Sequence, residues 1–122
     1  MQKISFFSFK KKIFIIGKGV SFDTGGLNIK TGAGMSLMKK DMGGGGIAVA
    51  LARYIMFRGL NIFLRLLIPV VENSVSSNSF RPGDILNSRK GKTIEINNTD
   101  AEGRLILADA ITYADEKDPF LI

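Results

Sequence analysis

Two carboxylates and a guanidinium stand close together near the C-terminal end of the chain. Asp100, Glu102 and Arg104 come directly before an apolar pattern that predicts a helix. A loop that runs into a helix presents free backbone N–H groups, and negative charge is stabilised there. Asp100 and Glu102 can face one centre if the backbone between them is not yet helical. The same stretch also fits a capping box, with Thr99 as the N-cap and Glu102 three residues later.

Two further carboxylates stand at a turn and at a helix start. Asp23 precedes a Thr-Gly-Gly turn, and Asp41 lies just before the glycine run Gly43–Gly46. If all four carboxylates converge, their mutual repulsion must be neutralised. Two divalent cations would balance the charge, and metals held about 3.5–4 Å apart activate water and polarise a carbonyl or phosphoryl oxygen. The alternative is that the four residues are separate turn and cap residues.

Two lysines lie near the same predicted loops. Lys18 could be a nitrogen ligand only as the neutral amine, which burial and an adjacent cation favour. Lys30 could instead stay charged and stabilise an oxyanion. The chain contains neither histidine nor cysteine. A metal site must therefore use oxygen ligands, with lysine nitrogen as the exception, and a catalytic triad that depends on His or Cys is excluded.

The glycine runs allow two other interpretations. Gly17-Lys18-Gly19 and Gly43–Gly46 could cradle a phosphate at a helix start. However, the chain has no complete P-loop motif and no Gly-x-Gly-x-x-Gly after a strand. The other alternative is a fragment that folds but performs no chemistry.

The apolar patterns predict the elements that position these residues. Ile13–Ile16 and Asn61–Val71 have the composition of buried strands, and Ile47–Phe57 between them has that of a helix, ended by Gly59. A strand, a helix and a second strand indicate a crossover and a largely parallel sheet. We therefore expect an α/β fold, with a mixed, mostly parallel sheet flanked by helices.

Shorter elements fill the remaining chain. Before the first helix we predict an extended segment at 20–22, a hairpin-like excursion at 23–29, a loop at 31–34 and a helical segment at 35–42, whose methionines we expect to pack in the core. After the second strand we predict a polar loop at 72–79, a hairpin of 85–86 with 93–96, a helix at 105–114 and a strand that begins at Phe120. Because that last strand is cut after three residues, we expect a truncated domain.

Size and charge exclude several classes of protein. The 122 residues suffice for one domain, and 45% of them are hydrophobic, which excludes a disordered chain. The net charge is +6, but the basic residues lack the interleaved aromatics that stack on bases, so we expect no nucleic-acid partner. Arg65 and Pro69 interrupt the longest apolar stretch, which falls short of a membrane span. We expect a cytoplasmic chain with no membrane partner.

Three motifs together resemble the leucine aminopeptidase (cytosol aminopeptidase) family of dinuclear metallopeptidases, in the central part of its catalytic domain. They lie at Gly17–Lys30, Met35–Met42 and Asn98–Tyr113, in the family's order and spacing. The string Asn-Thr-Asp-Ala-Glu-Gly-Arg-Leu in the third motif is highly specific. The resemblance divides the chain into an N-terminal extension without an assignable role, 1–11, and a partial metallopeptidase catalytic domain, 12–122.

The resemblance implies a ligand set for two divalent metal ions. Lys18, Asp23, Asp41 and Glu102 would hold the tighter ion. Asp23, Asp100 and Glu102 would hold the more exchangeable one, so that Asp23 and Glu102 bridge the two metals. Mn²⁺, Zn²⁺ or Mg²⁺ would be suitable, since oxygen-rich sites discriminate weakly between them.

The resemblance also implies a reaction, the removal of N-terminal amino acids from peptides. Lys30 would polarise the scissile carbonyl, and Arg104 would hold a bicarbonate ion that acts as the general base, which a chain without histidine otherwise lacks. Met38 would line the pocket for the first side chain of the peptide substrate, and Asn98 would lie near the substrate. Family members are several times longer and usually form homohexamers. The alternative is a catalytically inactive fragment, from a split or truncated gene, that needs a complementing chain.

Overall fold

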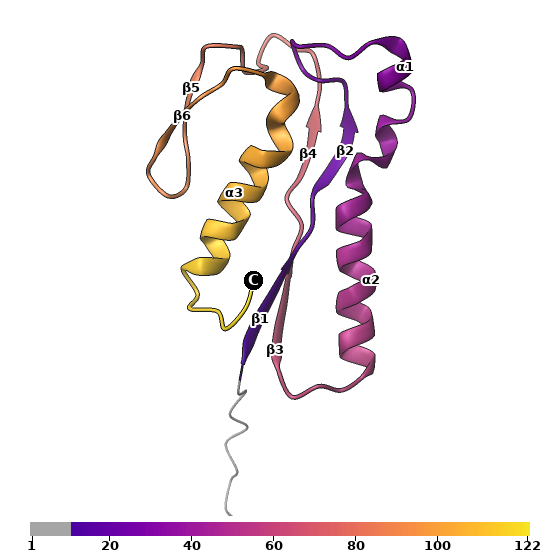
Figure 1. Cartoon of the computed structure of the whole chain (residues 1–122), viewed down its shortest axis with the longest axis vertical. Coiled ribbons are helices and arrows are strands. Elements are labelled where there is room, and N and C mark those ends of the chain that lie inside the picture. The colour runs from indigo at the N-terminus through magenta and orange to yellow at the C-terminus, as the bar shows by residue number, and fades with distance from the viewer. Residues whose placement is uncertain (1–10) are drawn as a thin grey trace, which may run out of the picture.

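The computed structural model describes residues 11–122, and their first half contains a parallel strand–helix–strand unit. Strand β1 (Lys12–Ile16) pairs in parallel with β3 (Phe63–Leu67), and the chain passes between them through helix α2 (Gly43–Phe57). Figure 1 shows α2 running alongside the strands. The crossover and the parallel pairing predicted from the apolar runs are therefore confirmed. The predicted N-terminal extension, 1–11, lies outside the described residues except for its last residue.

A second parallel pair continues the first pair end to end. Strand β2 (Gly19–Asp23) follows β1 and pairs with β4 (Val70–Asn73), which follows β3. The single strand predicted over Asn61–Val71 is thus wrong, because Pro69 has no N–H to donate and separates two strands. The second of these strands reaches Asn73, two residues into the predicted polar loop.

The segment between β2 and α2 differs most from the prediction. Helix α1 (Gly32–Met35) replaces a predicted loop, because the hydroxyl of Thr31 caps it by accepting the N–H of Gly34 at 3.3 Å. The 3-10 helix η1 (Met38–Met42) then leads directly into α2. The methionines of this segment are half-buried or exposed, with Met42 44% exposed, so the predicted core packing is wrong.

Of the hairpin-like excursion predicted at 23–29, the turn is present, but the extended segment expected at 27–29 is not a strand. Its alternating apolar residues, Leu27 and Ile29, are exposed rather than packed on a sheet. The segment forms a turn in which Thr24 O accepts the N–H of Lys30 at 2.9 Å. The turn returns the chain toward the sheet and sets the position of Lys30.

The C-terminal half contains a hairpin and a second long helix. Strands β5 (Ile85–Asn87) and β6 (Thr93–Glu95) form the predicted antiparallel hairpin. The 3-10 helix η2 (Thr99–Ala101) leads into α3 (Glu102–Asp115), which begins three residues before the predicted helix start. In Figure 1, α3 lies on the opposite side of the strands from α2.

The last residues return to the sheet. Leu121 bridges to Ile13 in parallel, and Leu121 O accepts the N–H of Phe14 at 2.9 Å. The strand predicted to begin at Phe120 is therefore present as a single bridge beside β1. The sheet pairs, the hairpin and the flanking helices confirm the mixed, mostly parallel α/β class.

The core is small. Its buried apolar side chains are Phe14, Val20, Ala48, Ala52, Ile96 and Ala114. One face of α2 remains open to solvent, where Ile47, Tyr54 and Phe57 are each more than half exposed. Within residues 11–122, no helix has the length and hydrophobicity that crossing a membrane requires.

Candidate metal centre

Three buried polar side chains meet where the carboxyl ends of β2 and β4 approach the start of α3. Asp23 ends β2, Asn73 ends β4 and Glu102 begins α3. Their exposed fractions are 3%, 5% and 4%, respectively. The pairing register places Asp23 opposite Asn73, after an irregularity that starts at Val20. Bulges of this kind re-aim side chains beside functional sites, and ligands in α/β folds bind at this end of the strands.

Three carboxylates form a compact cluster at this point. Asp23, Asp100 and Glu102 each offer an oxygen, and these atoms lie within 4.8 Å of one another. Asp100 lies inside η2, just before α3, and has a non-helical backbone with φ −80° and ψ 18°. This kink lets Asp100 and Glu102 face one centre, which was predicted for a backbone that is not yet helical between them. The interpretation of the four carboxylates as separate turn and cap residues is therefore wrong for these three.

The capping-box alternative is also wrong. The hydroxyl of Thr99 donates to Gly25 O at 2.6 Å and accepts the N–H of Asn28 at 2.8 Å, so it does not cap the helix. The side-chain oxygen of Asn98 instead accepts the N–H of Asp100 at 2.8 Å. Helix α3 begins without a side-chain cap, and the carboxylate of Glu102 is free to face the cluster.

Lys18 joins the fourth predicted carboxylate to the cluster. Its Nζ lies 2.7 Å from Asp41 Oδ2 and 3.0 Å from Glu102 Oε1. Burial lowers the pKa of Lys18, but the hydrogen bonds and charges of these two carboxylates outweigh burial and raise the pKa above its ordinary value. Asp41 Oδ2 is enclosed, and within residues 11–122 its partner is the ammonium group of Lys18.

Lys30 makes the corresponding contact on the other side of the cluster. Its Nζ lies 3.0 Å from Asp23 Oδ2 and hydrogen-bonds to Asp100 Oδ1. Burial lowers the pKa of Lys30, but its two carboxylate partners raise it on balance. Burial conversely raises the pKa of Asp23, yet the N–H of Gly25, Lys30 and the amide of Asn73 together lower it. Four carboxylates thus face two ammonium groups, which leaves an excess of negative charge.

The remaining predicted residues lie outside these contacts. Met38 begins η1 and is half-buried. The side chain of Asn98 contacts the cluster through the backbone N–H of Asp100. Arg104 is exposed on α3, where no hydrogen bond or ion pair engages it in the part of the chain described here. With Asn98 it lines a cavity of about 270 Å³.

Asn73 is a site residue that was not among those predicted from the sequence. Its Nδ2 lies 2.9 Å from Asp23 Oδ1, 3.0 Å from Glu102 Oε2 and 3.1 Å from Thr99 O. The sequence placed this residue in a polar loop. The available signal was its position two residues after the apolar run that ends at Val71, because polar residues at the carboxyl end of a parallel strand gather at one edge of the sheet.

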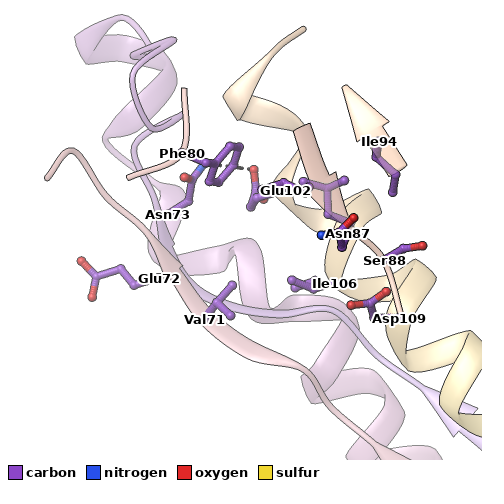
Figure 2. Close-up of a pocket in the computed structure, with 12 residues that line it drawn as sticks. Val71, Glu72, Asn73, Phe80, Asn87, Ser88, Ile94, Glu102, Ile106 and Asp109 are labelled. Carbon is purple, nitrogen blue, oxygen red and sulfur yellow. Dashed lines mark hydrogen bonds between the residues drawn. The ribbon is translucent and has the colours of Figure 1, made fainter. Parts of the chain in front are cut away.

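A larger cavity of about 350 Å³ opens beside Asn73 and Glu102. It lies between β4, the β5–β6 hairpin and α3, and its walls are mostly apolar. Figure 2 shows Asn73, Glu102 and Phe80 together at one end, and Ser88 with Asp109 at the other. The carboxylate cluster thus borders a space large enough for a small organic group.

The donor set fits divalent metal ions. It combines carboxylate oxygens with lysine nitrogens and contains no thiolate or imidazole, which suits Mg²⁺, Mn²⁺ and Zn²⁺ rather than softer ions. Fold and site thus define a carboxylate-rich centre at the edge of a parallel α/β sheet.

The model of the catalytic domain of the cytosol aminopeptidase family matches residues 4–122. The chain therefore belongs to this family.

Individual proteins agree with the family match. A probable cytosol aminopeptidase from Nostoc punctiforme is 52% identical over 108 residues, which are 88% of this chain and 22% of that protein. The crystal structure of a cytosol aminopeptidase from Coxiella burnetii superposes with a TM-score of 0.88 at 60% identity, covering 89% of this chain and 24% of that one. A bottromycin maturation enzyme in complex with Mn gives a TM-score of 0.79 at 39% identity, covering 84% and 23%. The chain thus spans about a quarter or less of the length of these proteins.

Proposed function

We propose that this chain carries the metal centre of an aminopeptidase that releases N-terminal amino acids from peptides. The observation that carries the proposal is the carboxylate cluster, in which oxygens of Asp23, Asp100 and Glu102 lie within 4.8 Å of one another beside two lysines. The excess negative charge of this cluster favours cations. Membership of the cytosol aminopeptidase family supports peptides as the substrate class.

The proposed metal ligands divide into two overlapping sets. Lys18, Asp23, Asp41 and Glu102 would hold the tighter ion, which the contacts of Lys18 with Asp41 and Glu102 support. Asp23, Asp100 and Glu102 would hold the exchangeable ion, and these are the three residues of the compact cluster. Bound divalent metals would activate water and polarise the scissile carbonyl. The relative in complex with Mn supports Mn²⁺, and Zn²⁺ fits the same donors.

The two lysines would have different roles. Lys18 would bind a metal as the neutral amine, so that metal binding releases its proton. Lys30 would remain an ammonium group, consistent with its raised pKa, and would stabilise the oxyanion that develops on the scissile carbonyl. A preorganised charge near this oxygen accelerates the reaction because its stabilisation grows as negative charge develops.

Arg104 is proposed to hold bicarbonate as the general base. Its exposed guanidinium beside the cavity of about 270 Å³ supports this role, since a guanidinium binds a planar oxyanion through two parallel hydrogen bonds. Met38 would line the pocket for the first side chain of the peptide, and Asn98 would lie near the substrate. Homohexamer formation and a cytoplasmic location are part of the same proposal.

A second candidate is a metal-binding piece that needs a complementing chain for catalysis. Two observations favour it: the chain spans 22% of the curated relative, and large apolar side chains of α2 are exposed. A contiguous exposed apolar surface commonly marks a contact with another segment. In this case the residues would bind metal but would not turn over peptides by themselves.

Metal stoichiometry tests the proposal. The purified chain is loaded with Mn²⁺ or Zn²⁺, dialysed and assayed by elemental analysis and with an amino-acid anilide. We expect about two metals per chain, and their loss in the double variant Asp100→Ala/Glu102→Ala. The matched control replaces two carboxylates outside the cluster, Glu95→Ala/Asp115→Ala, and should retain the metals. Metal without turnover would favour the complementing-chain alternative, and a folded chain that retains no metal would contradict both.

A further inference from the structure

We propose that Asn73 is a positioning residue that holds Asp23 and Glu102 at a fixed separation before any metal binds. The inference rests on the proposed function, in which these two carboxylates bridge the metals. Asn73 lies between them and donates from Nδ2 to Asp23 Oδ1 at 2.9 Å and to Glu102 Oε2 at 3.0 Å. A single side-chain amide thus connects the end of β2 to the start of α3.

The backbone of Asn73 is fixed from two directions. Its carbonyl oxygen accepts the N–H of Thr24 at 2.9 Å and the hydroxyl of Thr24 at 2.8 Å. The pairing register also holds it opposite Asp23. With the backbone and the amide both engaged in a buried site, the side chain has little freedom to rotate.

The space around the carboxamide is equally restricted. Its oxygen lies against Gly26, where an added Cβ would come within 2.9 Å of Asn73 Oδ1. Gly26 also has a positive φ of 64°, which side chains rarely adopt. The glycine therefore leaves room for the carboxamide in the orientation that directs Nδ2 toward the carboxylates.

The two carboxylates divide their oxygens between neutral and charged donors. Asp23 Oδ2 and Glu102 Oε1 contact the ammonium groups of Lys30 and Lys18, respectively. The other oxygen of each carboxylate contacts Asn73. Because a carboxamide is uncharged, it orients the two carboxylates without neutralising them, and the negative charge that attracts a cation is preserved.

The side-chain amide nitrogen of Asn73 also has more acceptors around it than it has hydrogens to donate. Nδ2 carries two hydrogens, but Thr99 O is a third acceptor at 3.1 Å. An apolar residue in the place of Asn73 would leave these acceptors without their common donor, and the two carboxylates would move apart by repulsion. Partners that orient metal ligands typically change metal affinity about 10- to 100-fold when they are removed.

The test compares Asn73→Leu, which has a similar shape but no donor, with Asn78→Leu, the same change at an exposed asparagine of the following loop. Free Mn²⁺ is measured by electron paramagnetic resonance during titration of each folded chain. The melting temperature of each metal-free chain is measured in parallel. We expect the Mn²⁺ dissociation constant to rise about 10- to 100-fold in Asn73→Leu and to stay unchanged in Asn78→Leu.

The outcomes separate this inference from the proposed function. A merely structural role would lower the melting temperature of Asn73→Leu and leave its Mn²⁺ affinity unchanged, which would overturn the inference alone. A wild-type chain that binds no Mn²⁺ would overturn the proposed function and the inference with it. If Asn73→Leu does not fold, the side-chain amide protons of Asn73 are followed by NMR in the wild-type chain. Slow exchange with solvent before Mn²⁺ is added supports the inference, and fast exchange overturns it.

Discussion

Thr99 and Asn28 exchange two hydrogen bonds although they are 71 residues apart in the sequence. The N–H of Thr99 donates to Asn28 Oδ1 at 2.8 Å, and the N–H of Asn28 donates to the Thr99 hydroxyl at 2.8 Å. The hydroxyl itself donates to Gly25 O. This connection fixes the loop that carries Lys30 against the segment that carries Asp100, so that the two sides of the carboxylate cluster form one unit.

The change Thr99→Val should therefore destabilise the chain. Thr99 is fully buried, and valine preserves its shape but removes the hydroxyl. Buried groups left without a partner typically cost about 1–3 kcal/mol, and we expect a loss of that size in the free energy of unfolding, measured by urea denaturation. Thr93→Val, at an exposed position of β6, is the matched control and should change stability little. Equal effects of the two substitutions would contradict the structural role of the hydroxyl.

Lys30→Met should separate catalysis from metal binding. Under the proposed function Lys30 stabilises the oxyanion and is not a ligand, so the variant should retain both metals. Removing one oxyanion-stabilising donor typically lowers kcat about 100- to 1,000-fold, and we expect a decrease of this size with an amino-acid anilide. Elemental analysis checks the metal content. Lys92→Met, in the hairpin, is the control, and loss of metal from Lys30→Met would assign Lys30 to the ligands instead.

The ion pair between Arg89 and Glu116 should make the thermal stability of the folded chain depend on pH. The guanidinium donates to both carboxylate oxygens at 2.9 Å, and these hydrogen bonds hold the pKa of Glu116 below its ordinary value of 4.5. A pKa lowered by folding adds stability at neutral pH, and this contribution is lost as the pH falls through the folded-state value. Thermal melts of the wild type and Arg89→Ala should thus differ at pH 7 and converge well below pH 4.5.

The salt concentration provides a second test of the ion pair between Arg89 and Glu116. Both side chains are about two-fifths exposed, so added salt should reduce the difference at pH 7. Arg89 also lies over the ring of Tyr113, with its guanidinium carbon 5.0 Å from the ring centre. That contact does not depend on the protonation of Glu116. A difference between wild type and variant that stayed constant across pH would assign the whole effect to the ring.

The predictable parts of this chain are those that local patterns determine. The apolar run at Ile13–Ile16 and the helical run at Ile47–Phe57 both formed the expected elements, because each pattern has one favourable way to bury its apolar side chains. Asp100 and Glu102 could be placed at one centre because they are neighbours in the sequence. The alternating pattern of Leu27 and Ile29 led to a wrong strand prediction. Such a pattern forms a strand only where a sheet face is available, and both side chains are exposed here.

The role of Asn73 could not be predicted in the same way. It depends on the register that sets Asn73 opposite Asp23 and on the packing of α3, which brings Glu102 to the same point. These are long-range relationships between three separate elements. The same holds for Thr99, whose partners lie in the loop after β2. The local pattern predicts that Thr99 caps helix α3. Its hydroxyl instead hydrogen-bonds to Gly25 and Asn28, which are distant in the sequence.

Gly103 gives the most selective test of the metal centre. A Cβ at Gly103 would lie 2.6 Å from Lys18 Cε and 2.8 Å from Lys18 Nζ. These atoms are the far end of a flexible side chain, so Gly103→Ala should displace Lys18 from Asp41 and Glu102 without unfolding α3. Alanine is also favoured over glycine in helices by about 1 kcal/mol. We therefore expect little change in stability but a loss of the tighter metal, measured by elemental analysis after dialysis.

Gly46→Ala is the matched control, because among residues 11–122 a Cβ at this position of α2 would meet only Met42 Cε, at 3.7 Å. It should stabilise the chain by about 0.5–1 kcal/mol and leave the metal content unchanged. The comparison isolates the position of the Lys18 amine from the general effect of alanine in a helix. If Gly103→Ala kept both metals, Lys18 would not be a metal ligand, and the tighter site would have to be held by carboxylates alone.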